Sequence, residues 1–512
     1  MERRKTLCAV GAVVLAAVLA GCGDVTDNEV PVDQVKKGSA HAGAAIHDPQ
    51  LLVGEDGTYY LFGSHMAAGT SEDLVNWDSF ADGVRKSNPL FDNLFDEEKA
   101  AFSYVGKNED GGYSVWAPNV IYNKAMGKYV MYFCTTSSYI KSNICFATAD
   151  DPKGPYTYQD TILYSGFTSQ TAKQTDFYDV MGEDVKITDY VKHGGFNNID
   201  WPNCIDPAVF YDADGKMWMV YGSWSGGIFL LELDEETGYP IHPETDEADN
   251  VNKYYGKRLC GGGHNSIEGP YIQYDEKSGY YYLLVSYGGL NRDGGYQIRE
   301  FRSDQVDGTY VDAKGQEMQK VLDHSGYGVK MMGNYTLPSL DVSYMAPGGQ
   351  SAFTDTDGKM YVVYHQRFDD GTEGHEPRVH QLFVNEDGWL VAAPFAASGE
   401  TLSEKGYRQK NLTGTYYILN HGTGINAKVK KGKEVTLHAD GNIDGSLEGS
   451  FSVEDGSNYV TVTEDGVDYK GVIIEMDDEA GNPVLCFSAV GDNNETIWGV
   501  HYLKEHTASY MQ

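Results

Sequence analysis

Short runs of alternating apolar and polar residues, joined by turns that contain Gly, recur along most of the chain. One phrase reads DPAVFYDADGKMWMVYG from Asp206, with a period-two run on each side of an Asp-Gly turn. This pattern predicts a β-hairpin. Helical periodicity is almost absent beyond the first residues, so the sequence predicts an all-β protein.

The hairpin phrase returns along the chain. Each copy has a small or acidic residue near Pro, an apolar run, a Gly turn and a second, aromatic-rich strand. The copies begin at Asp48, Ala117, Asp206, Glu268 and, in a weaker form, Ser351. Roughly 60 to 90 residues separate them, which leaves room for further strands in each unit. A β-sandwich also uses hairpins but would not repeat one phrase, so we expect a five-bladed β-propeller.

The pattern changes at about residue 400. Pro becomes rare, and short segments such as EVTLHAD and NYVTVTEDG follow one another with tight polar turns. We therefore expect the propeller over residues 43–398 and a small antiparallel β-barrel over residues 399–512. The second domain contains no cluster of acids, His or Ser that indicates a site, so a packing or spacer role is favoured.

The first residues have the pattern of a targeting segment. A basic start at residues 3–5 precedes an apolar stretch that is short for a membrane span. The stretch ends in Leu-Ala-Gly-Cys, which resembles a bacterial lipobox and implies lipid attached to Cys22; an ordinary secretory signal is the alternative. We expect a signal peptide over residues 1–21, a flexible tether over residues 22–42, and an exported protein that contacts a membrane only through its lipid.

Composition limits the partners. Asp and Glu total 75 against 39 Lys and Arg, a net charge of −36, which disfavours nucleic acid, anionic lipid and polyanionic substrates. The chain is 12% aromatic and contains 60 glycines, which suits strands, tight turns and stacking on sugars. The cysteines after Cys22 show no CxxC spacing, although a Cys134–Cys145 pair across neighbouring strands remains possible.

Three acidic residues occupy matching places in the repeat. Asp48 and Asp206 each precede Pro at the start of a blade's first strand, and Glu268 lies one residue earlier in its copy. Acidic residues before Pro commonly cap turns. The starts of innermost strands, however, line the mouth of a propeller's channel, so these carboxyls should converge. Crowding raises the pKa of at least one, and paired acid and base carboxyls are the equipment of glycoside hydrolysis.

At these residues the sequence resembles glycoside hydrolase family 43, a family of five-bladed inverting hydrolases, and within it the endo-α-1,5-L-arabinanases. The resemblance covers roughly residues 42–398, and the trailing barrel resembles the C-terminal domain of larger secreted members. The matching phrases are HDPQLL at His47, SVWAPNV at Ser114, NCIDPAVFYDADGKMWMVYGS at Asn203, GGGHNSIEGPY at Gly261, MGNYTLPS at Met332, YMAPGGQSAFTDTDGKMYVVYHQRF at Tyr344 and RVHQLFVNEDGWLVAAPF at Arg378.

The resemblance implies a role for each carboxyl. Asp48 is expected to be the general base that activates water, Glu268 the general acid that protonates the leaving oxygen, and Asp206 the residue that orients the acid and raises its pKa. It also implies one metal ion, usually calcium, on the propeller axis, reached by His365 in VVYHQRF. His380 is the competing ligand and is expected to be structural.

Substrate contacts are expected from two aromatic residues and three polar ones. Trp224 in Gly-Ser-Trp-Ser-Gly is the first stacking candidate, although this phrase is one aromatic shorter than the family's usual form. Trp116 is a second stacking candidate, with a core position as the alternative, and His264 is expected to fix the loop that carries Glu268. The polar candidates are Asn203, Ser223 and Ser225.

These features favour an endo-acting enzyme, and three alternatives remain. An exo-acting α-L-arabinofuranosidase or a β-xylosidase would use the same fold and carboxyls, and the insertion at residues 166–198 would then plug one end of the groove. A surface glycan-binding lipoprotein would need no matched acid and base. The expected partner is plant cell-wall arabinan or its oligosaccharides, bound by a monomer.

Overall fold

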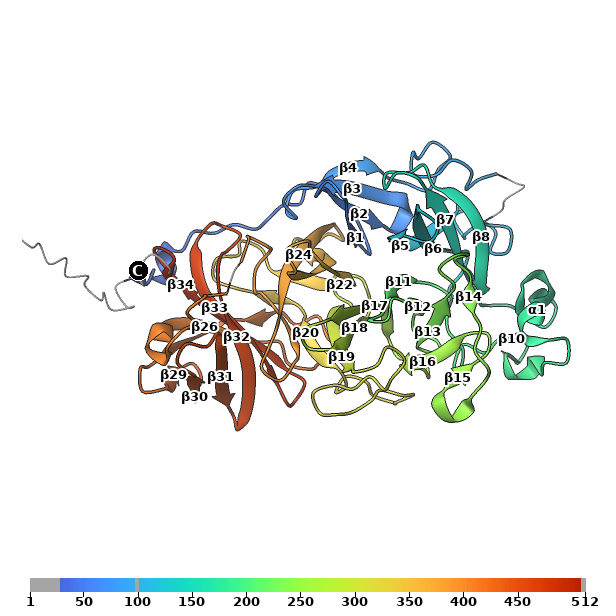
Figure 1. The fold of residues 1–512 in the computed structure, drawn as a ribbon. Helices are drawn as coiled ribbons and strands as arrows, with labels where there is room; N and C mark the ends of the chain where they lie inside the picture. Colours follow the sequence, from blue (N-terminus) through green and yellow to red (C-terminus); the bar gives the residue numbers. More distant parts are fainter. Residues whose placement is uncertain (1–27, 97–100, 401, 508–512) are drawn as a thin grey trace, which may run out of the picture.

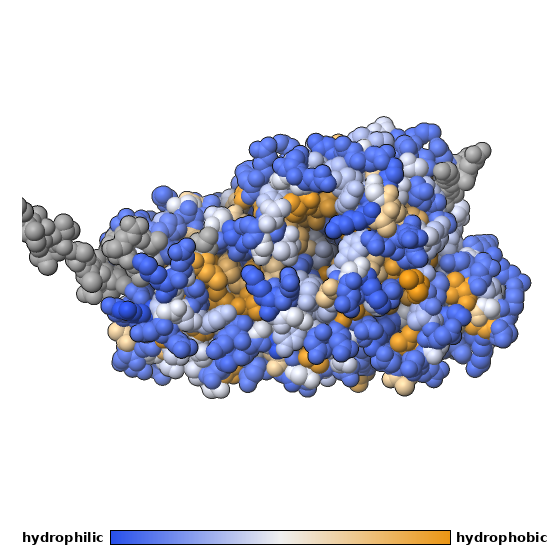
Figure 2. Space-filling model, viewed as in Figure 1, coloured by the Kyte–Doolittle hydropathy of each residue, from blue (hydrophilic) through white to orange (hydrophobic). Residues whose placement is uncertain are grey.

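The computed structural model describes residues 28–96, 101–400 and 402–507. A five-bladed β-propeller is followed by a closed eight-stranded β-barrel, which confirms the predicted architecture (Figure 1). Within the described ranges, no helix combines the length and apolar character needed to cross a bilayer. The face seen in Figure 2 is largely hydrophilic, and its apolar residues gather in small patches.

Each blade is built on an antiparallel sheet of four strands, with extra strands added to the third and fifth. The first two blades contain β1 (Gln50–Val53), β2 (Tyr59–Gly63), β3 (Ala67–Ser71), β4 (Asp78–Ala81), β5 (Ser114–Asn123), β6 (Lys128–Thr136), β7 (Ser142–Ala149) and β8 (Thr157–Tyr164). The third contains β11 (Ala208–Tyr211), β12 (Met217–Tyr221), β13 (Ile228–Leu233), β14 (Pro240–Ile241), β15 (Val251–Asn252) and β16 (Gly256–Cys260). The last two contain β17 (Ile267–Asp275), β18 (Tyr280–Tyr287), β19 (Gln297–Ser303), β20 (Val329–Met332), β21 (Tyr335–Thr336), β22 (Tyr344–Thr354), β23 (Met360–Phe368), β24 (His375–Val384) and β25 (Leu390–Ala392).

The innermost strands β1, β5, β11, β17 and β22 contact one another in a closed ring around the axis. Local turn chemistry sets the hairpins of the blades. In the β11–β12 turn, Asp212 Oδ1 accepts hydrogen bonds from the amides of Asp214 and Lys216, both at 2.9 Å. Gly215 follows at φ +80°, a conformation that favours glycine. The Asp-Gly signal therefore fixes where β12 turns back along β11.

The five blades share one unusual backbone conformation. The residue before the inner-strand Pro has positive φ in every blade: 49° at Asp48, 40° at Ala117, 55° at Asp206, 57° at Gly269 and 48° at Ala346. Non-glycine residues pay about 1–3 kcal/mol for such a conformation, and it clusters at functional sites. The fifth copy of the repeat therefore begins at Ala346, five residues before the position predicted from its sequence.

The barrel packs against the propeller through an apolar interface. Alternate residues of β33 face opposite ways: Val484 and Cys486 join an apolar cluster shared with the fifth blade, whereas Leu485 and Phe487 fill the barrel interior. The barrel strands are β26 (Gly414–Asn420), β28 (Lys433–Leu437), β29 (Asn442–Gly445), β30 (Gly449–Val453), β31 (Tyr459–Glu464), β32 (Val467–Asp477), β33 (Pro483–Gly491) and β34 (Thr496–Tyr502).

Residues 28–42 differ from the flexible tether that the sequence predicted. The segment runs from the barrel to the first blade (Figure 1), and its backbone is hydrogen-bonded to both domains. The Val30 amide donates to the Tyr502 carbonyl at 3.0 Å, and the Gly38 amide donates to the Ser339 carbonyl at 2.9 Å. Val35 is buried. These contacts fix the segment, while residues 22–27, the signal peptide and Cys22 lie outside the described residues.

The Cys134–Cys145 pair that the sequence left possible does not form. Cys134 lies opposite Ile144 and Cys145 lies opposite Phe133 on strands β6 and β7. Because neighbouring residues on a strand point to opposite faces, the two sulfurs lie on different sides of the sheet. All five cysteines in the described part of the chain are free and buried.

Candidate active site

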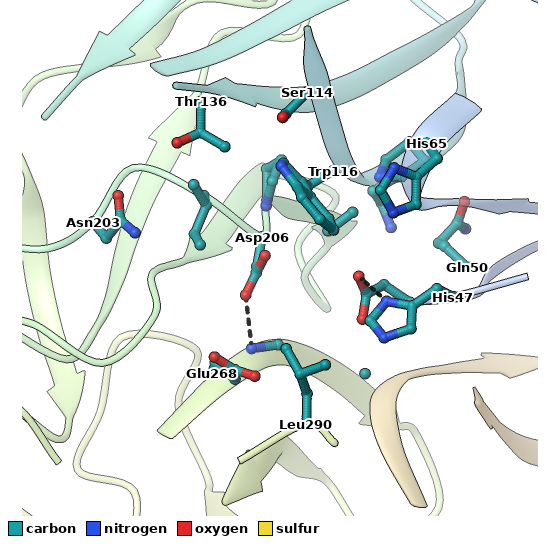
Figure 3. Close-up of a pocket in the computed structure, with 18 of the residues that line it drawn as sticks. His47, Gln50, His65, Ser114, Trp116, Thr136, Asn203, Asp206, Glu268 and Leu290 are labelled. Atoms are coloured by element: carbon teal, nitrogen blue, oxygen red, sulfur yellow. Dashed lines mark hydrogen bonds and ion pairs between the residues drawn. The ribbon is translucent and has the colours of Figure 1, made fainter. Parts of the chain in front are cut away.

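A cavity of about 630 Å³ opens where the inner strands begin, and it is lined by residues from all five blades. Asp48, Asp206 and Glu268 all line it, from the first, third and fourth blades. Figure 3 shows Asp206 pointing toward Glu268, with His47 across the cavity. The carboxyls that occupy matching places in the repeat therefore meet at one site.

Asp48 is held by donors from its own blade and a histidine of the fifth. His47 Nδ1 donates to its Oδ2 at 2.7 Å, and the Ser64 hydroxyl donates to the same oxygen at 2.6 Å. His365 Nδ1 lies 3.7 Å from its Oδ1. Burial raises the pKa of Asp48, but the two histidines and the Ser64 hydroxyl outweigh it and hold that pKa well below its ordinary value. Asp48 is therefore ionised at neutral pH.

A glycine in the fifth blade makes room for this carboxylate. A Cβ on Gly349 would lie 2.3 Å from Asp48 Oδ1 and 2.8 Å from His365 Nδ1. No other residue fits there without displacing one of the two side chains. The Gly-Gly pair in YMAPGGQ therefore permits the blade to approach the Asp48 carboxylate closely.

Three side chains donate hydrogen bonds to Glu268. Tyr296 donates to Oε1 at 2.9 Å, while Ser223 and the Trp224 indole donate to Oε2 at 3.0 and 2.8 Å. Burial raises the pKa of Glu268, and the charge of Asp48 raises it further. The three donors lower this pKa, but the net shift is upward. The carboxyl is thus fixed in direction and retains a proton more readily than an exposed Glu.

Asp206 is the third member. Its Oδ2 accepts a hydrogen bond from the Gly269 amide at 3.1 Å, drawn as a dashed line in Figure 3. Burial raises its pKa well above the ordinary value, and the charges of Glu268 and Asp48 raise it further. Since like charges so close cannot ionise independently, Asp206 and Glu268 titrate as a pair that keeps a proton to higher pH than either alone.

His365 lies below this cavity on β23. It is fully buried, its ring stacks on His47 with centroids 4.0 Å apart, and its Nε2 has no hydrogen-bond partner among the described residues. Burial lowers its pKa well below the ordinary value, so the ring is neutral and able to ligate a cation. Candidate ligand atoms of His47, Asp48 and His365 all lie within 4.8 Å of one another.

His380, the competing candidate, lies away from that cluster. Its Nδ1 is 2.7 Å from the Ala393 carbonyl and its Nε2 is 3.0 Å from the Tyr364 hydroxyl. Both ring nitrogens therefore have protein partners. This agrees with the structural role expected for it.

The five expected substrate contacts divide into two groups. Trp116 and Asn203 line the cavity, whereas Ser223, Trp224 and Ser225 are not among the described residues that line it. Ser223 and Trp224 instead contact the Glu268 carboxyl, and Ser225 is fully buried. The Gly-Ser-Trp-Ser-Gly phrase thus holds the Glu268 carboxyl.

Asn203 and Trp116 differ in what they offer to a ligand. The Asn203 amide nitrogen donates to the Tyr139 carbonyl at 2.8 Å, and its oxygen accepts from Ser165 at 3.3 Å. Its amide is thus occupied by the protein. The Trp116 ring lies in the cavity wall beside His65, with centroids 4.5 Å apart (Figure 3), and offers a flat surface. His264 is not among the described residues that line the cavity, and its ring lies 5.5 Å from that of Trp224.

The insertion at residues 166–198 does not plug the groove. It contains α1 (Phe177–Met181), β9 (Val191–Lys192) and β10 (Gly195–Phe196), which lie at the far edge of the propeller in Figure 1. None of its residues lines the cavity. The cavity wall is formed instead by the long connection between β4 and β5, which contributes residues 108–110 and Tyr113, and by shorter loops that carry the exposed side chains of Tyr139 and Leu290.

Sequence reasoning missed several members of the site. It assigned no role to His47, Ser64 or Tyr296, which donate to Asp48 or Glu268. His47 had a local signal, because it directly precedes Asp48 in HDPQLL. Ser64 and Tyr296 had none, because they reach the carboxyls from other strands or loops.

Comparison with known proteins agrees with this architecture. Residues 43–168 and 158–390 match the family described as Glycosyl hydrolases family 43, and residues 394–499 match its C-terminal lipocalin-like domain. The chain is 38% identical over 472 residues to extracellular endo-alpha-(1->5)-L-arabinanase 2 of Bacillus subtilis, covering 89% of this chain and 92% of that protein. It is 37% identical to an extracellular endo-alpha-(1->5)-L-arabinanase of Thermotoga petrophila, covering 89% and 93%.

A solved structure agrees as well. A family 43 glycoside hydrolase from Bacillus licheniformis superposes with a TM-score of 0.79 at 36% identity, covering 92% of this chain and all of that one. The matches span both the propeller and the barrel. On this ground the chain belongs to glycoside hydrolase family 43.

Proposed function

We propose that this protein is an endo-α-1,5-L-arabinanase that cleaves the backbone of arabinan with inversion. One observation carries the proposal: a single cavity holds three carboxyls whose surroundings drive their pKa values apart, downward at Asp48 and upward at Asp206 and Glu268. Such divergence supplies a base and an acid at the same pH.

The geometry supports a division of labour. Ionised Asp48 takes a proton from water as the water attacks the anomeric carbon. Glu268, held in place by its three donors, gives its proton to the departing glycosidic oxygen. Asp206 accepts a hydrogen bond from the Gly269 amide beside Glu268, and ionisation of either carboxyl of this pair disfavours ionisation of the other. An inverting site needs about 6.5–9.5 Å between base and acid to admit the water.

The choice of arabinan rests on the named activity of the relatives and on charge. Both relatives compared above are named for cleavage of α-(1->5)-linked arabinan, and both are covered over most of their length. The net charge of −36 suits an uncharged polysaccharide. No residue of the insertion at 166–198 lines the cavity, which favours endo action over an exo-acting arabinofuranosidase or β-xylosidase.

Product analysis tests this function. Incubated with linear debranched arabinan, the enzyme is expected to release a ladder of arabino-oligosaccharides early, with little arabinose. Aryl xylosides should remain intact. Release of arabinose alone from the first minutes would assign exo action, and binding of arabinan without cleavage would assign the glycan-binding role.

We propose further that His365 holds one Ca²⁺ ion. The unpartnered Nε2 of this buried, neutral ring fits a metal ligand. Calcium prefers oxygen ligands, so water and the neighbouring Asp48 carboxylate would have to complete its shell. When bound, the ion would supply fixed positive charge beneath the sugar.

Chelation and metal analysis test this site. We expect about one calcium per wild-type chain, partial loss of activity on chelation, and recovery when calcium is added. His365→Ala should lose both the metal and most activity. His380→Gln is the matched control, a second buried histidine, and should keep the metal. Equal calcium content in wild type and His365→Ala would exclude this ligand.

We propose that the protein is exported and anchored by lipid on Cys22. The basic start, the apolar stretch and the Leu-Ala-Gly-Cys phrase support this, and both relatives are named as extracellular. Cell fractionation should find the enzyme with membranes and a Cys22→Ala variant free of them. Equal membrane association of the two would contradict the anchor.

A further inference from the structure

A loop of the C-terminal barrel reaches the inner end of the fifth blade. Residues 421–431 leave the barrel between β26 and β28, and β27 (Lys430–Lys431) pairs in parallel with β21 of the propeller. β21 in turn pairs with the start of β22, the innermost strand of that blade. The loop therefore lies next to the strand start that borders the active site.

Buried propeller side chains hold the loop backbone. Lys330 and Gln297 donate to the Gly424 carbonyl at 3.0 and 3.2 Å, and Asn334 donates to the Ala427 carbonyl at 3.0 Å. Burial lowers the pKa of Lys330 to about 7, which shows how completely the propeller and the loop enclose it. The loop is thus bound by specific polar contacts as well as by apolar packing.

The loop ends against a small apolar cluster behind the proposed acid. Val429 packs on the cluster formed by Tyr296, Met345 and Ala346. Tyr296 is 2% exposed, and its hydroxyl donates to Glu268 Oε1 at 2.9 Å. On another side its ring meets Gly348, where an added Cβ would lie 2.2 Å away. The Tyr296 ring has little room to move without a change in this cluster.

We infer that Val429 is a positioning residue for the acid, and that it acts through the cluster that holds Tyr296 against Glu268. The barrel thereby supports the active site rather than serving only as a spacer. This inference rests on the proposed role of Glu268. Because proton donation needs the carboxyl aligned with the leaving oxygen, a small displacement of Tyr296 should slow substrates that require the proton.

Ile425 provides a matched control on the same loop. It is half-buried like Val429, but it packs against a different cluster, between the third and fourth blades. Truncation of either residue removes apolar packing at the interface between the domains. Only Val429→Ala should change how the acid is held.

The experiment compares linear arabinan with a nitrophenyl arabino-oligoside, whose leaving group departs without a proton. Val429→Ala should lower kcat on arabinan about tenfold and change the aryl substrate less than about twofold. Ile425→Ala should leave the ratio of the two rates at its wild-type value. A Val429→Ala variant that slows both substrates equally, or an Ile425→Ala variant with the same altered ratio, would overturn the inference.

A double-mutant cycle tests whether Val429 acts on Glu268 through Tyr296. Tyr296→Phe should itself slow arabinan selectively, and adding Val429→Ala to it should cause little further loss. Additive losses, or a Tyr296→Phe variant with the wild-type ratio, would exclude action through Tyr296. The wild type is measured alongside, and its inactivity on arabinan would refute the proposed function. If the wild type is active but the variants keep its ratio of the two rates, only the positioning role is refuted.

Discussion

Replacing Glu268 with Gln is expected to lower kcat on linear arabinan by about 10²–10⁴-fold, the usual contribution of a general acid. The amide has no proton to give to an arabinose leaving group. It keeps the shape of the side chain, and its one carbonyl oxygen can accept either from Tyr296 or from Ser223 and Trp224, so the fold should be kept, which circular dichroism checks. A nitrophenyl arabino-oligoside should lose much less activity, because its leaving group needs no proton.

Glu300 is the matched control for this substitution. It lies on β19 of the same blade, fully buried, and burial raises its pKa well above the ordinary value. Gln has the same shape, and neither Glu300 oxygen has a hydrogen-bond partner among the described residues, so Glu300→Gln should keep wild-type rates on both substrates. Equal loss on both substrates in Glu268→Gln, or full activity on arabinan, would refute the acid role.

The pH dependence of the wild type follows from the same pair. A general acid must be protonated, so activity is present below its pKa and is lost as pH rises through it. Since burial raises the pKa of both Asp206 and Glu268, the alkaline limb of kcat/KM should lie above the ordinary Glu value of about 4.3. The low pKa of Asp48 places the acidic limb below it.

The repeat made the fold and the convergence of the carboxyls predictable. Hairpins with Asp-Gly turns imply strands, and five copies of one phrase imply five blades around an axis. Equivalent positions then have to meet, as Asp48 and Asp206 do. The start of the fifth copy was predicted five residues too far along the chain. Its phrase was aligned on the strand before the Gly turn and not on Ala346-Pro347.

Contacts between segments that lie far apart in the sequence could not be predicted from it. Residues 28–42 have the composition of a linker, and only their contacts with both the barrel and the propeller order them. Trp224 was expected to stack on sugar, yet its indole N–H faces Glu268. An aromatic residue in a Gly-rich loop has the same sequence pattern in either role. Which way its ring turns depends on the neighbouring blade.

Replacing Asp48 with Asn should also lower kcat on arabinan by about 10²–10⁴-fold. The amide can accept from Ser64 but cannot take the proton of the attacking water. Here the aryl substrate should lose as much as arabinan, because every substrate needs the water. This contrasts with Glu268→Gln, so the two variants together separate base from acid. A selective loss on arabinan alone would contradict the base role of Asp48.

The stereochemistry of the first product tests the role of Asp48 more deeply. If Asp48 directs water to the face opposite the leaving group, attack and departure occur in one step, and an α-arabinoside must first yield β-arabinose. If Asp48 attacked the sugar itself, a covalent intermediate would form and the first product would be α. Proton NMR of a short oligosaccharide in the opening minutes, before mutarotation, distinguishes the two. An initial α product would replace the general base by a nucleophile, and with it the inverting mechanism.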